Sequence, residues 1–226
     1  MTFNFIKLES LDFDLNSETT DSGRKYVTPD GKRYPSVTTV LGELNKKAIL
    51  EWRKRVGEEQ ANKISGRASR RGTKLHSLCE QYLLGDLSDM KRRSLMPLDK
   101  MMFNQLKSSL DENVNNIHCL EQALYSHKLR IAGRVDLIAE WDGELSVIDF
   151  KSSTKEKKEE NIQNYFMQCT AYSEMFEEIT GIEINKIVVA IATEEQVPQF
   201  FIKHKKHYLD KLVKHVEDYH INKNQY

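Results

Sequence analysis

The chain has 226 residues, of which 39% are hydrophobic and 30% are charged, enough for one domain with a sizeable core. The 34 basic and 34 acidic residues balance, which excludes a surface coated uniformly with positive charge. The distribution is uneven, because residues 46–74 hold ten Lys or Arg and three Glu, whereas residues 9–22 hold five acids and no base. A neutral protein with such basic blocks can bind an anionic polymer along one channel.

The three cysteines, Cys79, Cys119 and Cys169, are far apart, and none belongs to a CxxC pair. This pattern favours ordinary thiols in a reducing compartment over a disulfide framework or a zinc site. No segment approaches the roughly 20 apolar residues of a membrane-spanning helix. The N-terminus is acidic and lacks the basic start of a signal or transit peptide, so we expect a cytoplasmic protein.

The N-terminal half reads as an arm, a hairpin and helices. Residues 1–23 are acidic and polar and are expected to form a loosely packed arm. Pro-Asp-Gly between two tyrosine-containing segments predicts a hairpin over 25–36. Caps, glycines and apolar spacing place the helices. In chain order they run from Ser36 to Leu41 or Leu44, over 46–71 with interruptions at Gly66 and Gly72, from the capping residue Thr73 to Gly85, and over 98–113.

The pattern then changes to the period of strands. Asp142-Gly143 is a strong hairpin turn between two of them. The strands are expected over 119–126, 130–141, 144–150, 186–193 and 196–203, the last an edge strand because Pro198 cannot donate to a ladder. A helix is expected over 162–181, and a basic amphipathic helix closes the chain. We therefore predict an α/β fold with an N-terminal helical layer. Its parts are an acidic arm over 1–23, a hairpin and basic helical region over 24–72, and a core over 73–226.

An acid and a lysine end one predicted strand, in Asp149-Phe150-Lys151. Side chains two apart on a strand point to the same side. The pattern alone is weak, and it recurs at Asp30-Gly31-Lys32 in a predicted turn. Asp136 changes this, because the hairpin brings its apolar strand beside that of Asp149. Two converging carboxylates repel unless a divalent cation lies between them. The alternative is a salt-bridge cluster with Lys151.

Three further residues are ambiguous when each is taken alone. His76 lies on the apolar face of its predicted helix, where a histidine is more often a core residue than a ligand. Gln168 and Tyr172 are four apart and share one helix face, which suits core packing with one hydrogen bond.

The order of these motifs is more specific than any one of them. GTxxH at 72–76, GRVD at 133–136, IDFKSS at 148–153 and QxxxY at 168–172 together resemble the PD-(D/E)xK nucleases of the RecB-like branch. The upstream segments YPSVTTVL and LEWRKRVGEE extend the resemblance to mitochondrial and phage exonucleases of that branch, over about residues 24–215. It implies a restriction-endonuclease-like core with a central mixed β-sheet flanked by helices. It also implies a bacterial or phage-infected host cell.

The resemblance implies a metal site that holds Mg²⁺ or Mn²⁺. His76, Asp136 and Asp149 would be ligands, with the backbone carbonyl of Phe150 as a further one. Glu121 is a candidate for a second-metal or water-mediated ligand. Carboxylate ligands suit Mg²⁺ or Mn²⁺ better than Zn²⁺. The scattered cysteines imply that the iron–sulfur cluster of some RecB-like relatives is not expected here.

The resemblance also implies roles in phosphodiester hydrolysis. Lys151 would position and activate the attacking water, and Gln168 and Tyr172 would orient the lysine or grip a phosphate. Glu80, one turn after His76, is a further candidate ligand, although a solvated side chain is the more common case for such a residue. A carboxylate-bound metal supplies both charge neutralisation and a hydroxide at neutral pH.

The resemblance and the basic block point to DNA as the substrate. The residues that could line a DNA channel are Arg53, Arg55, Arg67, Arg70 and Arg71, with Trp52 to stack on a base. We expect a metal-dependent exonuclease that prefers single-stranded DNA and acts with DNA replication, recombination or repair proteins. The alternatives are a flap or junction endonuclease of the same fold and a non-catalytic DNA-binding module.

Overall fold

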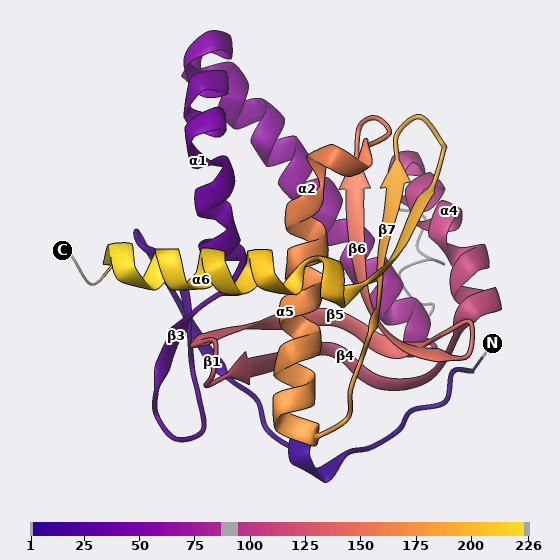
Figure 1. Ribbon diagram of the computed structural model, residues 1–226. Helices are drawn as coiled ribbons and strands as arrows, with labels where there is room; N and C mark the ends of the chain where they lie inside the picture. The colour runs from indigo at the N-terminus through magenta and orange to yellow at the C-terminus, as the bar shows by residue number, and fades with distance from the viewer. Residues whose placement is uncertain (1, 87–94, 224–226) are drawn as a thin grey trace.

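The computed structural model describes residues 2–86 and 95–223. Its centre is a five-stranded mixed sheet in the order β4-β5-β6-β7-β8 (Figure 1). All neighbouring strands are antiparallel except β6 and β7, which are parallel. The strands are β4 Val114–Ser126, β5 Ile131–Trp141, β6 Glu144–Ser153, β7 Lys186–Thr193 and β8 Gln199–His204. The predicted α/β fold with a mixed sheet is confirmed, and β8 is the edge strand expected from Pro198.

Local sequence explains the connections within this sheet. Asp142 and Gly143 both have positive φ angles, 52° and 74°, as the tight hairpin between β5 and β6 requires. The parallel pair β6 and β7 needs a crossover, which α5 Gln163–Thr180 provides. The helix stops where Gly181 adopts the left-handed conformation, as its position in the sequence predicts.

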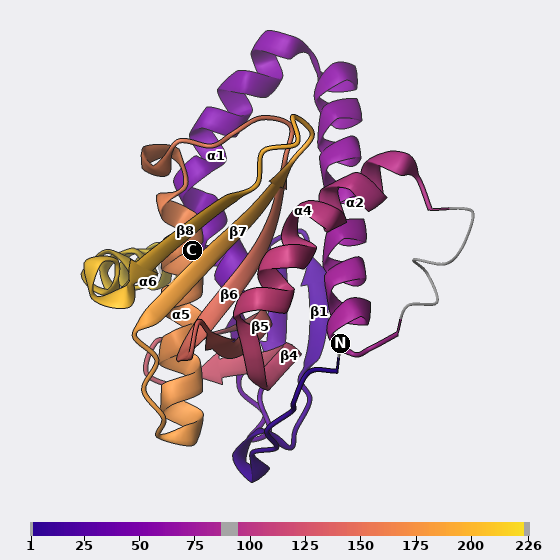
Figure 2. The same ribbon diagram turned by 90° about the vertical axis from the view of Figure 1, so that its right-hand side faces the viewer.

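Helices cover both faces of the sheet, so that helices, sheet and helices form three layers (Figure 2). One face packs against α5, α6 Leu209–Lys223 and the start of α1 Val37–Val56. The other face packs against α2 Glu58–Leu83 and α4 Pro97–Asn113. Central strands are therefore buried on both sides, which explains the continuous apolar run of β7. None of the helices within 2–86 and 95–223 has the length and apolar content to cross a membrane.

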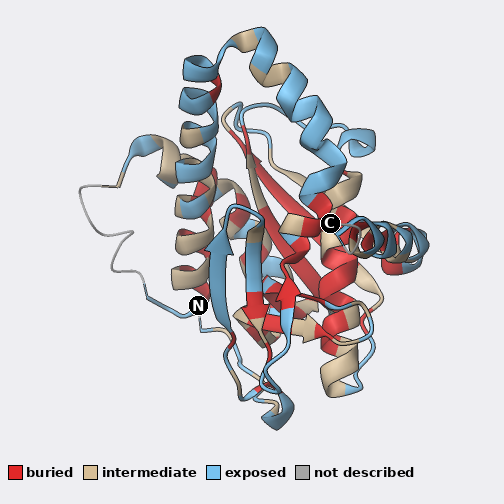
Figure 3. Ribbon diagram, turned by 90° about the vertical axis from the view of Figure 1, so that its left-hand side faces the viewer, coloured by how far each residue is buried: buried red, intermediate tan, exposed pale blue. Residues whose placement is uncertain are grey.

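The helices α1 and α2 form a long hairpin whose far end is exposed to solvent (Figure 3). Ser36 caps α1 as predicted, but α1 continues to Val56, and the break falls at Gly57, which has φ 86°. The predicted interruptions at Gly66 and Gly72 and the cap at Thr73 are wrong. A helix-interior glycine costs only about 1 kcal/mol, which the surrounding helix formers offset.

The division of the chain at residues 72 and 73 therefore falls inside α2, which passes through it without a break. Gly72 lies beside the end of β6, where a Cβ built on it would be in ordinary contact with Ser152 Oγ, at 3.7 Å. The neighbouring Arg71 donates a hydrogen bond to the same Ser152 hydroxyl, which ties α2 to the strand. The N-terminal helices and the sheet are thus joined in one packed unit.

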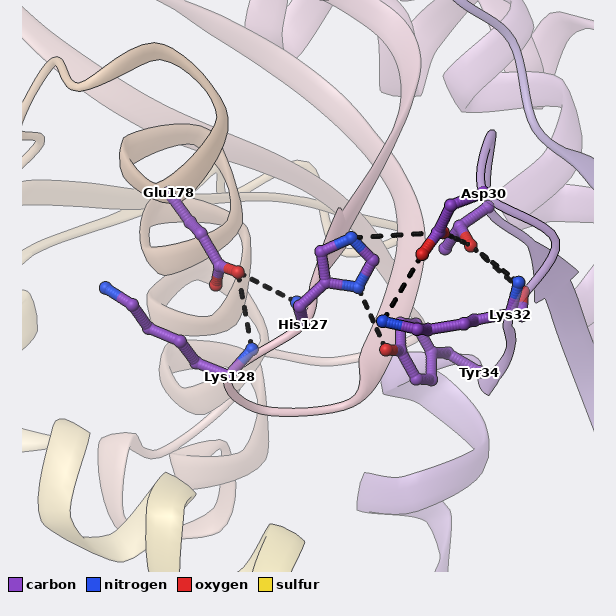
Figure 4. Close-up of polar contacts among 7 residues, drawn as sticks. Asp30, Lys32, Tyr34, His127, Lys128 and Glu178 are labelled. Carbon is purple, nitrogen blue, oxygen red and sulfur yellow. Dashed lines mark hydrogen bonds and ion pairs between the residues drawn. The ribbon is translucent and has the colours of Figure 1, made fainter.

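The predicted loose arm is also wrong in part. Residues Asn16–Thr20 form β1, which pairs with β2 Gly23–Val27, and β2 pairs with β3 Arg33–Pro35 in the predicted hairpin. This small sheet packs against β4 and β5 through an apolar cluster. Tyr34 Oη lies 2.9 Å from His127 Nδ1, and Asp30 lies 3.9 Å from His127 Nε2 (Figure 4). Asp30 and Lys32, where the acid–lysine pattern recurs, thus form an exposed ion pair in a turn, with 3.3 Å between Lys32 Nζ and Asp30 Oδ2.

Candidate active site

The site begins where β5 and β6 separate. Their ladder runs from the hairpin as far as the pair Leu137 and Ile148. The next two residues in that register are Asp136 and Asp149, which are not paired through their backbones. Instead, the Asp136 carboxylate accepts a hydrogen bond of 2.8 Å from the backbone N–H of Phe150. A side chain thus replaces a ladder bond, and both acids remain buried in the opening between the strands.

Glu121 adds a third carboxylate to this row. Its neighbours Leu120 and Gln122 pair with Leu137 and Val135, so Glu121 lies opposite Asp136. Glu121 itself has φ 48°, the left-handed conformation that is uncommon for a non-glycine residue. The irregular backbone of β4 therefore carries this acid beside the opening, and Glu121, Asp136 and Asp149 lie on three adjacent strands.

His76 reaches the same point from α2. Its Nδ1 lies 3.3 Å from Asp136 Oδ1 and 3.9 Å from Glu121 Oε1. The imidazole also stands edge-on to the Phe150 ring, with the ring centroids 6.3 Å apart. One ligand atom from each of His76, Glu121 and Asp136 lies within 4.8 Å of the others. The structure thus brings the predicted ligands His76 and Asp136 together with the candidate Glu121.

The electrostatics of this group depend on burial and on mutual charge. Burial raises the pKa of Glu121, and the charge of Asp136 adds to it, giving a pKa of about 7. Burial alone would lower the pKa of His76, but the charge of Asp136 and its hydrogen bond raise it to about 9. Burial would raise the pKa of Asp136, yet His76 and Lys151 hold it below its usual range. Without a metal, His76 therefore carries the proton that balances the acids.

This set of side chains fits a divalent cation. Two carboxylates and one imidazole converge from three different elements, and the repulsion that raises the pKa of Glu121 is what a cation would remove. A cation would also take the place of the proton on His76. The donors are mainly oxygen, as Mg²⁺ and Mn²⁺ prefer.

Asp149 faces Lys151 and α5 rather than this three-residue group. Its Oδ2 forms a close ion pair with Lys151 Nζ, and its Oδ1 accepts a hydrogen bond of 3.1 Å from Gln168 Nε2. Gln168 Nε2 also lies 3.5 Å from Tyr172 Oη. The Lys151 ammonium sits 5.1 Å from the centre of the Tyr165 ring. The predicted catalytic residues on β6 and α5 therefore form one connected network. It lies beside His76, Glu121 and Asp136, the three candidate ligands that we call the metal group.

The charges of this second network are strongly coupled. Burial raises the pKa of Asp149 to about 6, although the neighbouring Lys151 opposes the shift. Burial would lower the pKa of Lys151, but the charges of Asp149 and Asp136 hold it above its usual range. Lys151 is therefore an ammonium group at neutral pH, which can donate hydrogen bonds but cannot accept a proton.

A cavity of about 510 Å³ opens onto both groups. Its walls come from β2, α1, α2, the sheet and α5. The lining residues include Arg24, Asn45, His76, Glu121, Arg134, Asp136, Lys151, Tyr165, Gln168 and Tyr172. The side chains that carry the chemistry thus face a space that can hold a ligand.

The basic residues of the helical hairpin have different surroundings. Arg71 donates 3.2 and 3.0 Å hydrogen bonds to Ser152 and Thr154 and pairs closely with Glu194, which Arg67 also contacts at 2.7 Å.

Arg53 pairs with Glu58 and lies 2.6 Å from Asn62, whereas Trp52 is half-buried. Arg55 and Arg70 are exposed. Within the described part of the chain, Arg71 thus joins α2 to the sheet, and the more solvent-facing arginines are the ones open to a ligand.

Several residues of the site were not singled out from the sequence, among them Asn45 and Arg134, which line the cavity. Tyr165 lies three residues before Gln168 on the same face of α5, a spacing that could have revealed it. Gly133 leaves room for the Tyr172 ring, because a Cβ at this position would lie 2.9 Å from the ring. Its place in the GRVD motif could have indicated that it belongs to the site. Arg24 lies on the small N-terminal sheet, and no local pattern marks it as part of the site.

Known nucleases have sequences similar to this chain. Residues 90–218 match the family model of the PD-(D/E)XK nuclease superfamily. The human mitochondrial genome maintenance exonuclease 1 is 30% identical over 149 residues, which cover 61% of this chain and 42% of that protein. The chain thus spans less than half the length of this relative.

A solved structure from Eubacterium rectale, assigned as an exonuclease, is similar with a TM-score of 0.47 and 13% identity, over 69% of this chain and 68% of that one. The family match covers more than half of the chain, from α4 to α6, and includes the acids on β4, β5 and β6. The chain belongs to the PD-(D/E)XK nuclease superfamily.

Proposed function

We propose that this nuclease is a Mg²⁺- or Mn²⁺-dependent exonuclease that hydrolyses single-stranded DNA. The observation that supports the proposal is the opening between β5 and β6, where His76, Glu121 and Asp136 converge beside the Asp149–Lys151 pair. The similarity to a human exonuclease of genome maintenance supports DNA as the substrate and a strand end as its point of attack.

His76, Glu121 and Asp136 would hold the metal, with Asp149 as a ligand that could join them after release from Lys151. When bound, a divalent ion supplies charge neutralisation on the scissile phosphate and a lower pKa for a nearby water. The backbone carbonyl of Phe150 remains a candidate further ligand. The hydrogen bond from the Phe150 N–H fixes one Asp136 oxygen and leaves the other facing His76 and the cavity.

Lys151 and Asp149 are the residues that would handle the attacking water. The Lys151 ammonium holds the water and a phosphate oxygen by donating hydrogen bonds. While it is paired with Lys151 and not bound to the metal, Asp149 can accept a proton from the water. The water oxygen forms a bond to phosphorus, the bond from phosphorus to one sugar oxygen breaks, and that oxygen takes a proton from solvent. Gln168 and Tyr172 orient Asp149.

The shape of the cavity favours a single strand. Arg24 and Asn45 line one side, from β2 and α1, whereas Tyr165 lines another from α5. A volume of about 510 Å³, open to solvent on one side and bordered by these residues, suits one or two nucleotides rather than a duplex. Tyr165 offers a ring on which a base can stack, and Arg55 and Arg70 on the helical hairpin are exposed and can contact the strand beyond the cavity.

The test uses oligonucleotides labelled separately at each end, in Mg²⁺ or Mn²⁺. Lys151→Ala should abolish cleavage while DNA binding is largely retained, because the lysine acts on the reacting atoms and the arginines remain. Lys155→Ala, in the exposed segment after β6, is the matched control and should cleave normally. Unchanged cleavage by Lys151→Ala would contradict the assignment.

Linear and circular single strands separate an exonuclease from an endonuclease. An exonuclease should degrade the linear strand and leave the circle intact. Degradation of the circle, or selective cleavage at a flap or junction, would favour the endonuclease alternative. DNA binding without cleavage in either metal would favour the non-catalytic module.

A further inference from the structure

A second cavity, of about 520 Å³, meets the first one at the metal group. Arg24, His76 and Glu121 line both cavities. The remaining lining of the second cavity comes from α2 alone and consists of Gly72, Thr73, Ser77 and Glu80. The metal group thus stands at the junction of two spaces of similar size, each large enough for a nucleotide.

The charges of the two cavities differ once the shared residues are set aside. The first cavity alone has the cations Arg134 and Lys151, with Asp136 against them. The second cavity alone has Glu80 and two hydroxyl side chains, and no cation of its own. The first space therefore suits the phosphates of a strand, whereas the second suits a group that donates hydrogen bonds.

Arg24 is fixed at the boundary between them. Its backbone N–H donates to Thr39 Oγ1 at 3.1 Å, and its carbonyl accepts from Ser36 N–H at 2.8 Å. The N-terminal end of α1 therefore holds the backbone of Arg24 in place. Its guanidinium has no hydrogen bond or ion pair among the residues that the structure describes, and Arg24 lines both cavities. A phosphate at the junction would supply the missing partner.

Glu80 is close enough to act on the shared boundary. It lines the second cavity together with His76 and Glu121. A metal at His76, Glu121 and Asp136 would neutralise that group, but Glu80 lies one turn further along α2 and would remain a free carboxylate facing the second cavity.

We propose that the second cavity receives the terminal nucleotide of the strand, with its sugar hydroxyl toward Glu80 and its scissile phosphate beside Arg24. This inference rests on the proposed exonuclease function and adds a preference for the chemistry of the strand end. A sugar hydroxyl donates a hydrogen bond to the Glu80 carboxylate, and Thr73 and Ser77 can bond to the same sugar. A terminal phosphate would bring a second anion against Glu80, where like charges repel.

The experiment uses single-stranded DNA anchored at one end, so that only the other end is free. Four substrates of one sequence carry a free 5′-hydroxyl, 5′-phosphate, 3′-hydroxyl or 3′-phosphate. At the end from which the protein digests, the hydroxyl form should have a kcat/KM about tenfold or more above the phosphate form, as like-charge repulsion at short range implies. Glu80→Gln should reduce this ratio to about twofold, because the amide keeps the size of the side chain but removes its charge.

Glu59→Gln is the matched control, since Glu59 is an exposed acid on the same helix and far from both cavities. It should keep the wild-type ratio. The proposal is overturned if the wild type shows no preference or prefers a phosphate, or if Glu80→Gln slows all four substrates equally and leaves the ratio unchanged. Absence of cleavage of every substrate in both metals would instead refute the proposed function itself, and this inference with it.

Discussion

Gly133→Ala is a sharp test of how the sheet positions the catalytic network. Gly133 pairs with Leu124 on β4 and is buried against α5. A Cβ at this position would lie 2.9 Å from Tyr172 Cε1 and 3.1 Å from its Oη. Carbon atoms in favourable contact are about 3.5–4.0 Å apart, so the ring would have to move by roughly 0.6–1 Å. Tyr172 is only 2% exposed and packs between Gly133 and the cavity of the site, so the ring can shift only toward that cavity and away from its present contacts.

The size of the effect follows from this overlap. Overpacking a buried site costs about 1–3 kcal/mol, which corresponds to a fall in Tm of about 2–12 °C for a chain of this size. Displacing Tyr172 also disturbs Gln168 and through it Asp149, which are linked by contacts of 3.5 and 3.1 Å. A shift of 1 Å at reacting groups can lower a rate about 100-fold, so we expect cleavage to fall by at least tenfold.

The assay combines thermal unfolding with cleavage of an end-labelled oligonucleotide. Gly66→Ala is the control, because its Cβ would meet only the end of the Arg70 side chain at 3.4 Å, and helix propensity favours alanine by about 1 kcal/mol. In the Gly133→Ala background, Tyr172→Leu should recover stability but not cleavage. Normal stability and cleavage in Gly133→Ala would refute the reasoning.

Three further predictions test the metal group and the helical hairpin. Asp136→Asn and Asp136→Ala should both abolish cleavage, but only Ala leaves a buried N–H of β6 without an acceptor, and it should unfold about 1–3 kcal/mol more easily in denaturant titrations. In EDTA, the free energy of unfolding should fall as pH rises from about 4.5 to 9. The folded state raises the pKa of Glu121 to about 7 and that of His76 to about 9, so it binds these protons more tightly than the unfolded state does. This stabilisation is lost as each group releases its proton. The gain in Tm on adding Mg²⁺ or Mn²⁺ should grow over the same range, and a gain independent of pH would contradict the assigned ligands. Arg71→Ala should destabilise the fold by about 1.5–3 kcal/mol through its lost charged hydrogen bonds. Arg70→Ala should leave stability unchanged and weaken DNA binding in a fluorescence anisotropy titration. If Arg70→Ala instead destabilised the fold and Arg71→Ala weakened only DNA binding, the roles assigned to the two arginines would be wrong.

Much of the fold could be predicted because it depends on local patterns. The turn at Asp142-Gly143, the edge strand near Pro198 and the cap at Ser36 each depend on a few neighbouring residues, and each is confirmed. The errors arose where tertiary packing outweighed local preference. Gly72 would weaken an isolated helix, but the contacts of α2 with the sheet, such as the hydrogen bond from Arg71 to Ser152, keep the helix continuous there. The acidic segment 16–20 lacks a strand pattern and becomes a strand by pairing with β2.

The sequence by itself determined which residue types the site contains. The order of His76, Asp136, Asp149, Lys151 and the Gln168–Tyr172 pair along the chain identified the kind of nuclease core, because it resembles the motif order of the PD-(D/E)xK nucleases, the superfamily that the family model confirms. That information lies in the order and spacing of the motifs and needs no coordinates.

Only the tertiary structure decided how these residues are grouped. The separation of β5 from β6 and the left-handed backbone at Glu121 bring Glu121 into one group with His76 and Asp136, while Asp149 turns to Lys151. Arg24 enters the site because the small N-terminal sheet packs on β4 and β5. Such contacts join segments far apart in the sequence, and their energies depend on burial and distance, which no local pattern specifies.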